Sequence, residues 1–157
     1  MVRTWAPVGK TPVLAHKLTR DHLSVISAIS PEGELYLQVR ETPFDSLGII
    51  GFLSSLAQEI SGPMVLVWDG APIHRSKVVK AYLAEGAASR LHLERLPGYA
   101  PELNPDEGIW NYLKHVEMKN LCCTDVSHLK RELSAAEERL RQKPAIIRGC
   151  FEQTGYY

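Results

Sequence analysis

Two acidic residues in this sequence stand where a carboxylate could bind a metal ion. Asp69 directly follows the apolar run Met64–Trp68, and Glu107 follows Asn104 and Pro105 at the expected beginning of a helix. A carboxylate held at the end of a strand or a helix presents oxygen ligands at a fixed point, and hard divalent cations prefer oxygen ligands. The first chemistry to consider is therefore metal binding at a strand end.

Both acids also have an ordinary structural interpretation. Aspartate is common in turns and as a helix N-cap, and taken alone Asp69 fits that role better than a metal site. Asn104, Pro105 and Glu107 match the N-cap, the first helical residue and the third position of a capping box. On spacing alone, capping and metal binding are equally good interpretations of Glu107.

Other residues give weaker signals. His74 lies five residues after Asp69, and a lone histidine is more often structural, or a hydrogen-bond donor behind the metal ligands, than a ligand itself. The remaining histidines are scattered. Aromatic residues such as Trp110 serve packing more often than a site.

The composition describes one ordinary globular domain. The 157 residues are 45% hydrophobic and 23% charged, and the 18 basic residues balance the 18 acidic ones, so there is no global signal for nucleic acid. The three cysteines, an odd number without metal-ligand spacing, argue against a disulfide framework. No signal peptide and no apolar run of membrane-spanning length is apparent, so we expect a soluble, intracellular protein with no membrane partner.

A local excess of positive charge occupies the first twenty residues. This stretch has no acidic residue and four basic ones, which are Arg3, Lys10, Lys17 and Arg20. These four are candidates for contacts with a DNA backbone. Charge alone favours a solvated, extended arm.

Apolar spacing and turn residues predict the elements that must position the two acids. The predicted strands are residues 22–29, 34–39, 64–68 and 90–96. The predicted helices are residues 44–60, 75–85, 105–119 and 126–143. The first two strands form a hairpin, and the continuously apolar run 64–68 is typical of a strand that is covered on both faces.

This order of elements predicts a mixed α/β domain. In open sheets of this kind, chemistry collects at the carboxyl ends of the central strands, and Asp69 stands at such an end. Without internal repeats or a low-complexity linker, we predict one domain, with a core over residues 1–120 and a helical C-terminal extension over residues 121–157.

Two segments resemble the mariner-type transposases of the DDE superfamily, in their bacterial insertion-sequence branch. They are Val67–His74 (VWDGAPIH) and Leu96–Trp110 (LPGYAPELNPDEGIW), the latter followed by Lys114. The family has a strand ending in Asp-Asn/Gly-x-x-x-His and a segment Tyr/Ser-x-Pro-x-Leu-Asn-Pro-x-Glu-x-x-Trp-x-x-x-Lys. The interval between Asp69 and Glu107 is near that of the family. The resemblance covers about residues 1–120 and favours Glu107, rather than its neighbour Asp106, as the functional acid.

The resemblance implies a ribonuclease H-like mixed sheet flanked by helices and a metal-dependent chemistry on DNA. Such a domain cleaves phosphodiester bonds at transposon ends and transfers strands to target DNA. Asp69 and Glu107 would hold two Mg²⁺ or Mn²⁺ ions about 4 Å apart. Residues that support these ligands or contact DNA would be His74, Asn104, Trp110 and Lys114. The implied partners are transposon-end and target DNA and a second copy or a full-length transposase, in a bacterial, nucleoid-associated cytoplasmic setting.

The sequence departs from the family at one important place. In the family, an aspartate on the first and central strand precedes an Arg-Thr-Trp-Ala-Pro segment, and here that segment begins at Arg3. We therefore expect the first central strand and its aspartate to be absent from this chain, together with the family's helix-turn-helix region. Asp21 and Asp45 fall at other places in the pattern.

Two hypotheses follow. The chain is either a transposase catalytic domain whose activity needs the missing strand, supplied by frameshift or by another chain, or a non-catalytic remnant that binds full-length transposase or is inert. An unrelated metal-dependent phosphodiesterase with the same fold explains the Asn-Pro-x-Glu segment less well.

Overall fold

The computed structural model describes residues 6–10, 22–85 and 89–156. Its strands are β1 (Ser24–Ile29), β2 (Leu35–Arg40), β3 (Met64–Trp68) and β4 (Leu91–Arg95). Its α-helices are α1 (Ser46–Glu59), α2 (Lys77–Ala84), α3 (Pro105–Tyr112), α4 (Val126–Arg141) and α5 (Pro144–Thr154). Three short turns of other helix types complete it, the 3-10 helices η1 (Pro72–Arg75) and η2 (Pro101–Leu103) and the π-helical η3 (Leu113–Glu117).

The predicted elements are all present, and two differences have a local cause. The helix predicted over residues 105–119 changes to π-helical hydrogen bonding at Leu113, where the N–H of Met118 donates to the Leu113 carbonyl at 2.8 Å. Helix α5 was not predicted, because Pro144 was interpreted only as the end of α4. Proline is also well suited to the first turn of a helix, and here it begins α5.

The β1–β2 hairpin is antiparallel, from the pair Ser24 and Arg40 to the pair Ile29 and Leu35. Its turn is closed by Gly33, whose N–H donates to the Ser30 carbonyl at 3.0 Å. Gly33 has a φ of 97°, which favours glycine, and an added Cβ would lie 2.7 Å from the Cβ of Pro144. The beginning of α5 therefore packs directly on the hairpin turn.

The second sheet contains β3 and β4, which are parallel from Met64 opposite Leu91 to Trp68 opposite Arg95. Parallel neighbours need a crossover connection, and η1 and α2 provide it. The two sheets are separate, with β1 bonded only to β2 and β3 only to β4 among the described strands.

A cavity of about 460 Å³ lies between β1 and β3. The N–H of Met64 and the carbonyl of Trp68 are bonded towards β4, at 2.6 and 2.9 Å. Because successive residues of a strand direct their backbone groups to opposite sides, those of Val65 and Val67 face away from β4. No described strand pairs with this edge.

The prediction that β3 is covered on both faces was wrong. The residues Val65 and Val67 are 67% and 40% exposed. Consecutive side chains of a strand point to opposite faces, so the face that carries these two valines lacks a covering layer. The apolar run is that of a strand in the middle of a complete sheet, and the described chain covers only one of its faces.

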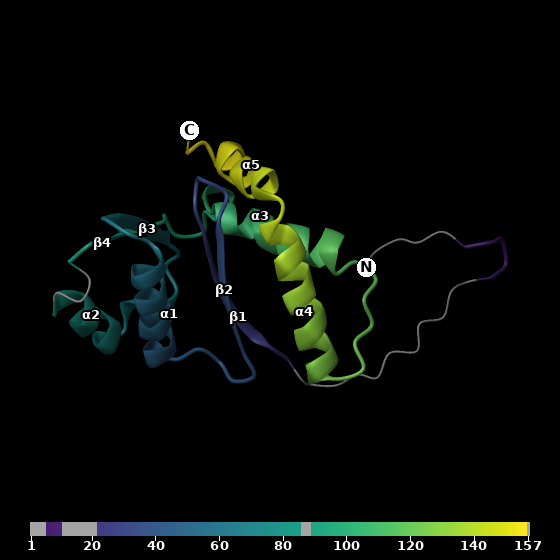
Figure 1. The fold of residues 1–157 in the computed structure, drawn as a ribbon, viewed down its shortest axis with the longest axis horizontal. Helices are drawn as coiled ribbons and strands as arrows, with labels where there is room; N and C mark the ends of the chain where they lie inside the picture. Colours follow the sequence, from purple (N-terminus) through teal and green to yellow (C-terminus); the bar gives the residue numbers. More distant parts are fainter. Residues whose placement is uncertain (1–5, 11–21, 86–88, 157) are drawn as a thin grey trace.

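The core has two hydrophobic clusters, one on each side of the hairpin strands (Figure 1). The first joins β2 to α3, η3, α4 and α5, and contains Leu35, Ile109, Leu113, Ala136, Leu140, Ile147 and Cys150. The second joins α1 and α2 to β3 and β4 and is centred on Ile49, Leu53 and Val79. Residues 121–157 thus contribute to the same cluster as the hairpin, and the boundary at residue 120 stays a prediction.

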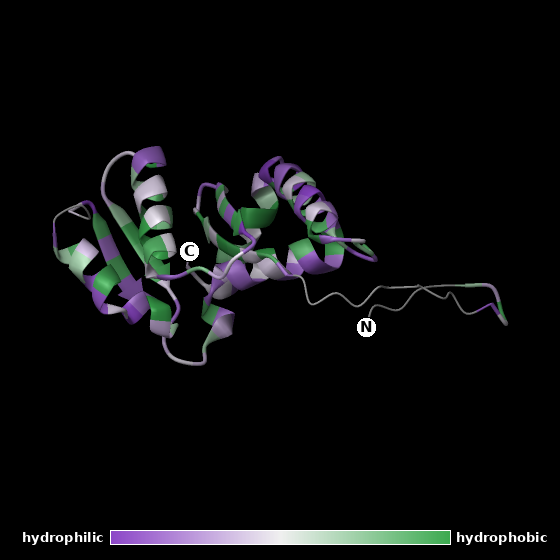
Figure 2. Cartoon of the chain, turned by 90° about the horizontal axis from the view of Figure 1, so that it is seen from below, coloured by the Kyte–Doolittle hydropathy of each residue, from purple (hydrophilic) through white to green (hydrophobic). Residues whose placement is uncertain are grey.

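The helices carry hydrophobic and hydrophilic residues on different faces (Figure 2). In α4, the buried residues are Leu133, Ala136 and Leu140, which lie on one face of the helix. None of the described helices is long and apolar enough to cross a membrane.

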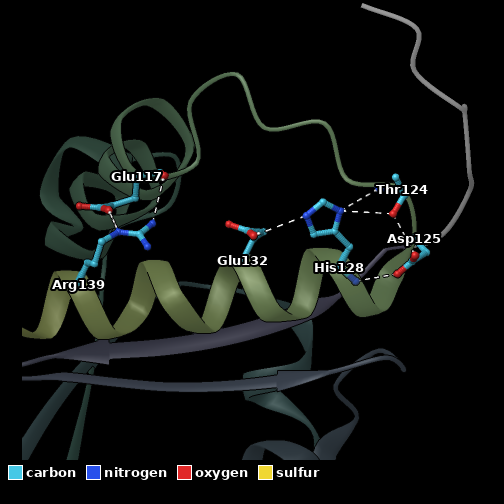
Figure 3. A network of polar contacts seen from close by, with 6 residues as sticks. All are labelled: Glu117, Thr124, Asp125, His128, Glu132 and Arg139. Carbon is cyan, nitrogen blue, oxygen red and sulfur yellow. Dashed lines mark hydrogen bonds and ion pairs between the residues drawn. The ribbon is translucent and has the colours of Figure 1, made fainter.

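Polar contacts hold α4 against η3 (Figure 3). The carboxylate of Glu117 accepts from Arg139 Nε and Lys143 Nζ, both at 2.6 Å, and its side chain is only 5% exposed. At the other end, Asp125 caps α4 by accepting from the N–H of His128 at 2.7 Å. These contacts hold α4, which packs against η3, α5 and β2.

Candidate active site

Asp69 lies at the carboxyl end of β3 and is held by a turn. Its Oδ1 accepts from the N–H of Ala71 at 2.9 Å and lies 3.2 Å from Nε2 of His74. Its side chain is 59% exposed, and Oδ2 forms no hydrogen bond with a described residue. The turn and ligand interpretations are therefore compatible, because the turn engages one oxygen and leaves the other free.

His74 contacts the Asp69 carboxylate and helps to hold it in place. Its ring stacks on Trp68 with the centroids 4.5 Å apart, and its side chain is 16% exposed. Burial lowers the pKa of His74, and the neighbouring Asp69 carboxylate opposes that shift in part. A neutral imidazole that donates from Nε2 to Asp69 leaves Nδ1 as an acceptor, and this buried Nδ1 has no partner among the described residues.

Glu107 lies in the first turn of α3 with its carboxylate unengaged. Its side chain is exposed and forms no hydrogen bond or ion pair with a described residue. Asn104 caps the helix by accepting from the N–H of Asp106 at 3.2 Å, while the N–H of Asn104 donates to the carbonyl of Pro101. Since η2 uses that N–H, Glu107 does not close a capping box.

Asp69 and Glu107 line one cavity of about 400 Å³. Its other walls are the turn after β3 and the loop Pro97–Pro101. Asp69, Leu96 and Asn104 also line the cavity between β1 and β3, so the two cavities adjoin at Asp69. The arrangement brings the two predicted acids to one cleft, beside the open edge of β3.

Two arginines in this cleft were missed by the sequence reasoning. Arg75 at the end of η1 and Arg95 at the end of β4 line the same cavity as the two acids. Neither belongs to the recognised motif pattern. For Arg95, the only indication is the pairing of β3 with β4, which sets it opposite Trp68 and next to Asp69. A single sequence does not reveal that register.

Asp106 faces the opposite way from Glu107. Its Oδ2 accepts from Ser27 Oγ at 2.6 Å and from Trp110 Nε1 at 3.0 Å, which ties α3 to β1. Burial raises the pKa of Asp106, and these two hydrogen bonds counteract that effect. Its buried Oδ1 has no described partner, and the residue lines the cavity between β1 and β3. Asp106 therefore has a structural role on the hairpin side.

Trp110 was expected to support Glu107, and Lys114 was expected to lie near the site as a contact for DNA phosphate. Trp110 is half-buried but bonds to Asp106 rather than to Glu107. Lys114 is exposed in the π-helical turn, with Nζ 5.9 Å from the centre of the Trp110 ring, and it does not line the cleft. The supporting residues that do reach the cleft or its ligands are His74 and Asn104.

Of the four basic residues near the N-terminus, Arg3, Lys17 and Arg20 lie outside the described residues. Lys10 is exposed in a turn, where its N–H donates to the Pro7 carbonyl at 3.0 Å. Among the described residues, no group of three or more His, Cys, Asp or Glu side chains could hold a metal ion. The cleft thus offers two carboxylates and two guanidinium groups.

The family model described as DDE superfamily endonuclease matches residues 2–130. The chain belongs to this family. A search of curated proteins gave no match.

The fold of this DDE superfamily member is similar to that of Mos1 structures. The Mos1 transposase paired-end complex with left transposon end has a TM-score of 0.63 and 14% identity, over 99% of this chain and 51% of that one. The Mos1 mariner paired end complex with Mn has a TM-score of 0.61 and 15% identity, over 98% of this chain and 51% of that one. The Mos1 strand transfer complex has a TM-score of 0.59 and 14% identity, over 99% of this chain and 50% of that one. At this identity the likeness shows the fold, which is ribonuclease H-like, and the chain spans about half the length of these relatives.

Proposed function

We propose that this chain is the catalytic domain of a mariner-type transposase, of the bacterial insertion-sequence branch. It would cleave phosphodiester bonds at transposon ends and join the ends to target DNA. The observation that carries the proposal is the shared cleft of Asp69 and Glu107, in which each acid has carboxylate oxygen free. Membership of the family and a fold shared with transposase–DNA complexes support it.

The donor set suits Mg²⁺ or Mn²⁺, which bind exposed carboxylate oxygens readily. Asp69 Oδ2 and the Glu107 carboxylate would be the ligands from this chain. When bound, divalent ions would activate the attacking hydroxyl and stabilise the leaving oxygen. The chain itself fixes the two acids, Asp69 through Ala71 and His74, and Glu107 through the capped beginning of α3.

We infer that a complete site needs one more strand between β1 and β3. The backbone groups of Val65 and Val67 face this space. His74 and Asp106 line the same cavity, and each has one buried polar atom without a described partner, Nδ1 and Oδ1 respectively. A strand there would bond on both sides and pass beside Asp69, where the family resemblance expects a further aspartate. The 157-residue chain alone is then inactive, whether another segment completes it or it is a non-catalytic remnant that binds full-length transposase.

The test compares the 157-residue chain with a version extended by an upstream strand ending in aspartate. The substrate is labelled DNA from the inverted repeats that flank the gene, with Mg²⁺ or Mn²⁺. We expect cleavage only by the extended protein, and loss of cleavage when the new aspartate, Asp69 or Glu107 is replaced by its amide. Metal-dependent cleavage by the 157-residue chain itself would contradict the inference of a missing strand.

The reading frame upstream of the Met1 codon separates the two forms of the proposal. An open frame, in phase or shifted by one base, that encodes an apolar strand ending in aspartate supports the enzyme. Stop codons in every frame support the remnant.

A further inference from the structure

We propose that Arg75 and Arg95 form a phosphate-binding pair in the cleft, and that Gly70 positions Arg95 beside Asp69. The ligand would be a phosphodiester group of a nucleic-acid backbone. It would lie next to the phosphodiester that is cleaved at the metal ions of Asp69 and Glu107. This inference rests on the proposed function, because it assigns the substrate contacts of the same cleft. The two arginines lie outside the recognised motifs, whereas Gly70 lies within the segment Val67–His74.

The position of Arg95 follows from close packing on a glycine. A Cβ added to Gly70 would lie 2.6 Å from Nη2, 3.1 Å from Nε and 3.3 Å from Cζ of Arg95. The guanidinium thus occupies the space that a side chain at position 70 would need, one residue after Asp69. The pairing of Trp68 with Arg95 holds the two strand ends side by side, so this contact is fixed by the sheet.

Both guanidinium groups are available for an anion. Neither Arg75 nor Arg95 forms an ion pair with a described residue, although Asp69 and Glu107 line the same cavity. Other arginines are engaged within the protein, for example Arg139 with Glu117. A guanidinium is a planar fork of donors that matches a phosphate group, and it keeps its charge at every physiological pH.

The charge of the cleft also fits a phosphodiester. Two carboxylates and two guanidinium groups sum to no net charge, and divalent ions on the carboxylates would make the cleft positive. Metal binding and phosphate binding would then reinforce each other. The competing view is that both arginines are solvated surface residues that only moderate the charge of the two acids.

Gly70 allows the two views to be separated. Its φ is not positive, unlike that of Gly33 or Gly62, so alanine is compatible with the backbone there. The three atoms nearest to the added Cβ all belong to the Arg95 guanidinium. Gly70→Ala therefore displaces Arg95 without changing any charge, and a general electrostatic effect predicts no change in phosphate binding.

The experiment is a titration of the ¹⁵N-labelled 157-residue chain with dimethyl phosphate, without divalent metal, followed by NMR. The Nε–Hε signals of Arg75 and Arg95, assigned from Arg→Lys variants, should shift. Arg131 is exposed on α4 and forms no ion pair with a described residue, so its signal is the internal control and should not shift. Backbone spectra of every variant show whether the fold is retained.

We expect Arg95→Gln and Gly70→Ala each to weaken dimethyl phosphate binding by about tenfold, the loss of one charge-assisted contact. The double variant should lose no more than either single one, because both changes remove the same contact. Arg131→Gln should have no effect. Unchanged binding by Gly70→Ala, or equal shifts at Arg131, would overturn the proposal.

Failure of this inference can be told apart from failure of the proposed function. One outcome is that Arg75 and Arg95 bind phosphate but the strand-extended protein shows no metal-dependent cleavage. That outcome would overturn the proposed transposase function and would support the phosphate-binding pair. Cleavage that survives Arg95→Gln with unchanged salt dependence of DNA binding would overturn the pair alone. The pair predicts a salt slope lower by about 1 for each arginine removed.

Discussion

The backbone N–H of Asn104 donates to the Pro101 carbonyl at 3.0 Å. In a capping box, that N–H would bind the side chain of the residue three positions later, which is Glu107. The 3-10 turn η2 thus takes the donor, and the acid at the beginning of α3 keeps its oxygens for the cleft.

Glu107→Gln and Asp106→Ala should have opposite effects. Glu107→Gln should remove Mn²⁺ binding and leave the free energy of unfolding within about 0.5 kcal/mol, because the side chain is exposed and unpaired. Asp106→Ala should keep Mn²⁺ binding and lower stability by about 1–3 kcal/mol, since Ser27 and Trp110 lose their acceptor. Calorimetric titration and urea unfolding measure the two quantities, and reversed effects would show that the acids were assigned the wrong way round.

His74 should act on metal binding through Asp69. Replacing it by alanine removes the contact at 3.2 Å and the stacking on Trp68, and metal affinity should fall by about 10- to 100-fold, as for other residues that orient ligands. His74→Gln, which retains a donor, should recover part of the loss. His128→Ala is the matched control, because His128 lies on α4 away from the cleft. Equal losses for both histidine variants would contradict the orienting role.

The contact of α3 with α5 should not tolerate a larger residue at position 108. A Cβ on Gly108 would lie 2.7 Å from Cys150 Sγ and 3.2 Å from its Cβ. Gly108→Ala should therefore lower the free energy of unfolding by about 1–3 kcal/mol through overpacking. Adding Cys150→Ala should recover part of that loss, so that the double variant is more stable than the sum of the single effects. Simple additivity in urea unfolding would argue against this contact.

Glu117 should make stability depend on acid pH. Hydrogen bonds from Lys143 and from Arg139, the latter drawn in Figure 3, hold the pKa of this carboxylate below its ordinary value. A carboxyl group with a lowered folded-state pKa stabilises the protein fully above its unfolded pKa, about 4.3, and loses that contribution as the pH falls through the folded value. Glu117→Gln should flatten this part of the curve of stability against pH. Glu138→Gln should not, because Glu138 is an exposed residue of α4. The measurement is chemical unfolding at a series of pH values from about 5 downwards.

Hydrogen exchange should report the open edge of β3. The amides of Val65 and Val67 face away from β4 and should exchange faster than that of Leu66, which faces β4. In the strand-extended protein, the valine amides should become as protected as Leu66. Equal protection of all three in the 157-residue chain would mean that another segment already occupies the gap.

Local signals in the sequence were sufficient for much of the site. The apolar run ending at Asp69 and the pair Asn104–Pro105 define β3 and the beginning of α3 by short-range rules, and the structure follows both. The family resemblance then favoured Glu107 over Asp106, and the structure places only Glu107 in the cleft.

What the sequence did not predict depends on contacts between distant segments. The place of Arg95 requires the register of β4 on β3, and the exposure of Val65 depends on a neighbour that the described chain lacks. Helix α5 was missed because Pro144 follows one helix and begins another. The contact of Pro144 with Gly33 joins residues that are far apart in the sequence, so short-range patterns do not predict it.

The division of the core into two clusters has a consequence for control of the reaction. Asp69 belongs to the part built around Ile49 and Leu53, whereas Glu107 belongs to the part built around Ile109. The spacing of the acids is thus a property of the seam between the parts, and neither part can set it alone. Under the proposed function, a segment that fills the cavity between β1 and β3 would set the spacing of the two acids. DNA cleavage would then occur only after that segment is in place.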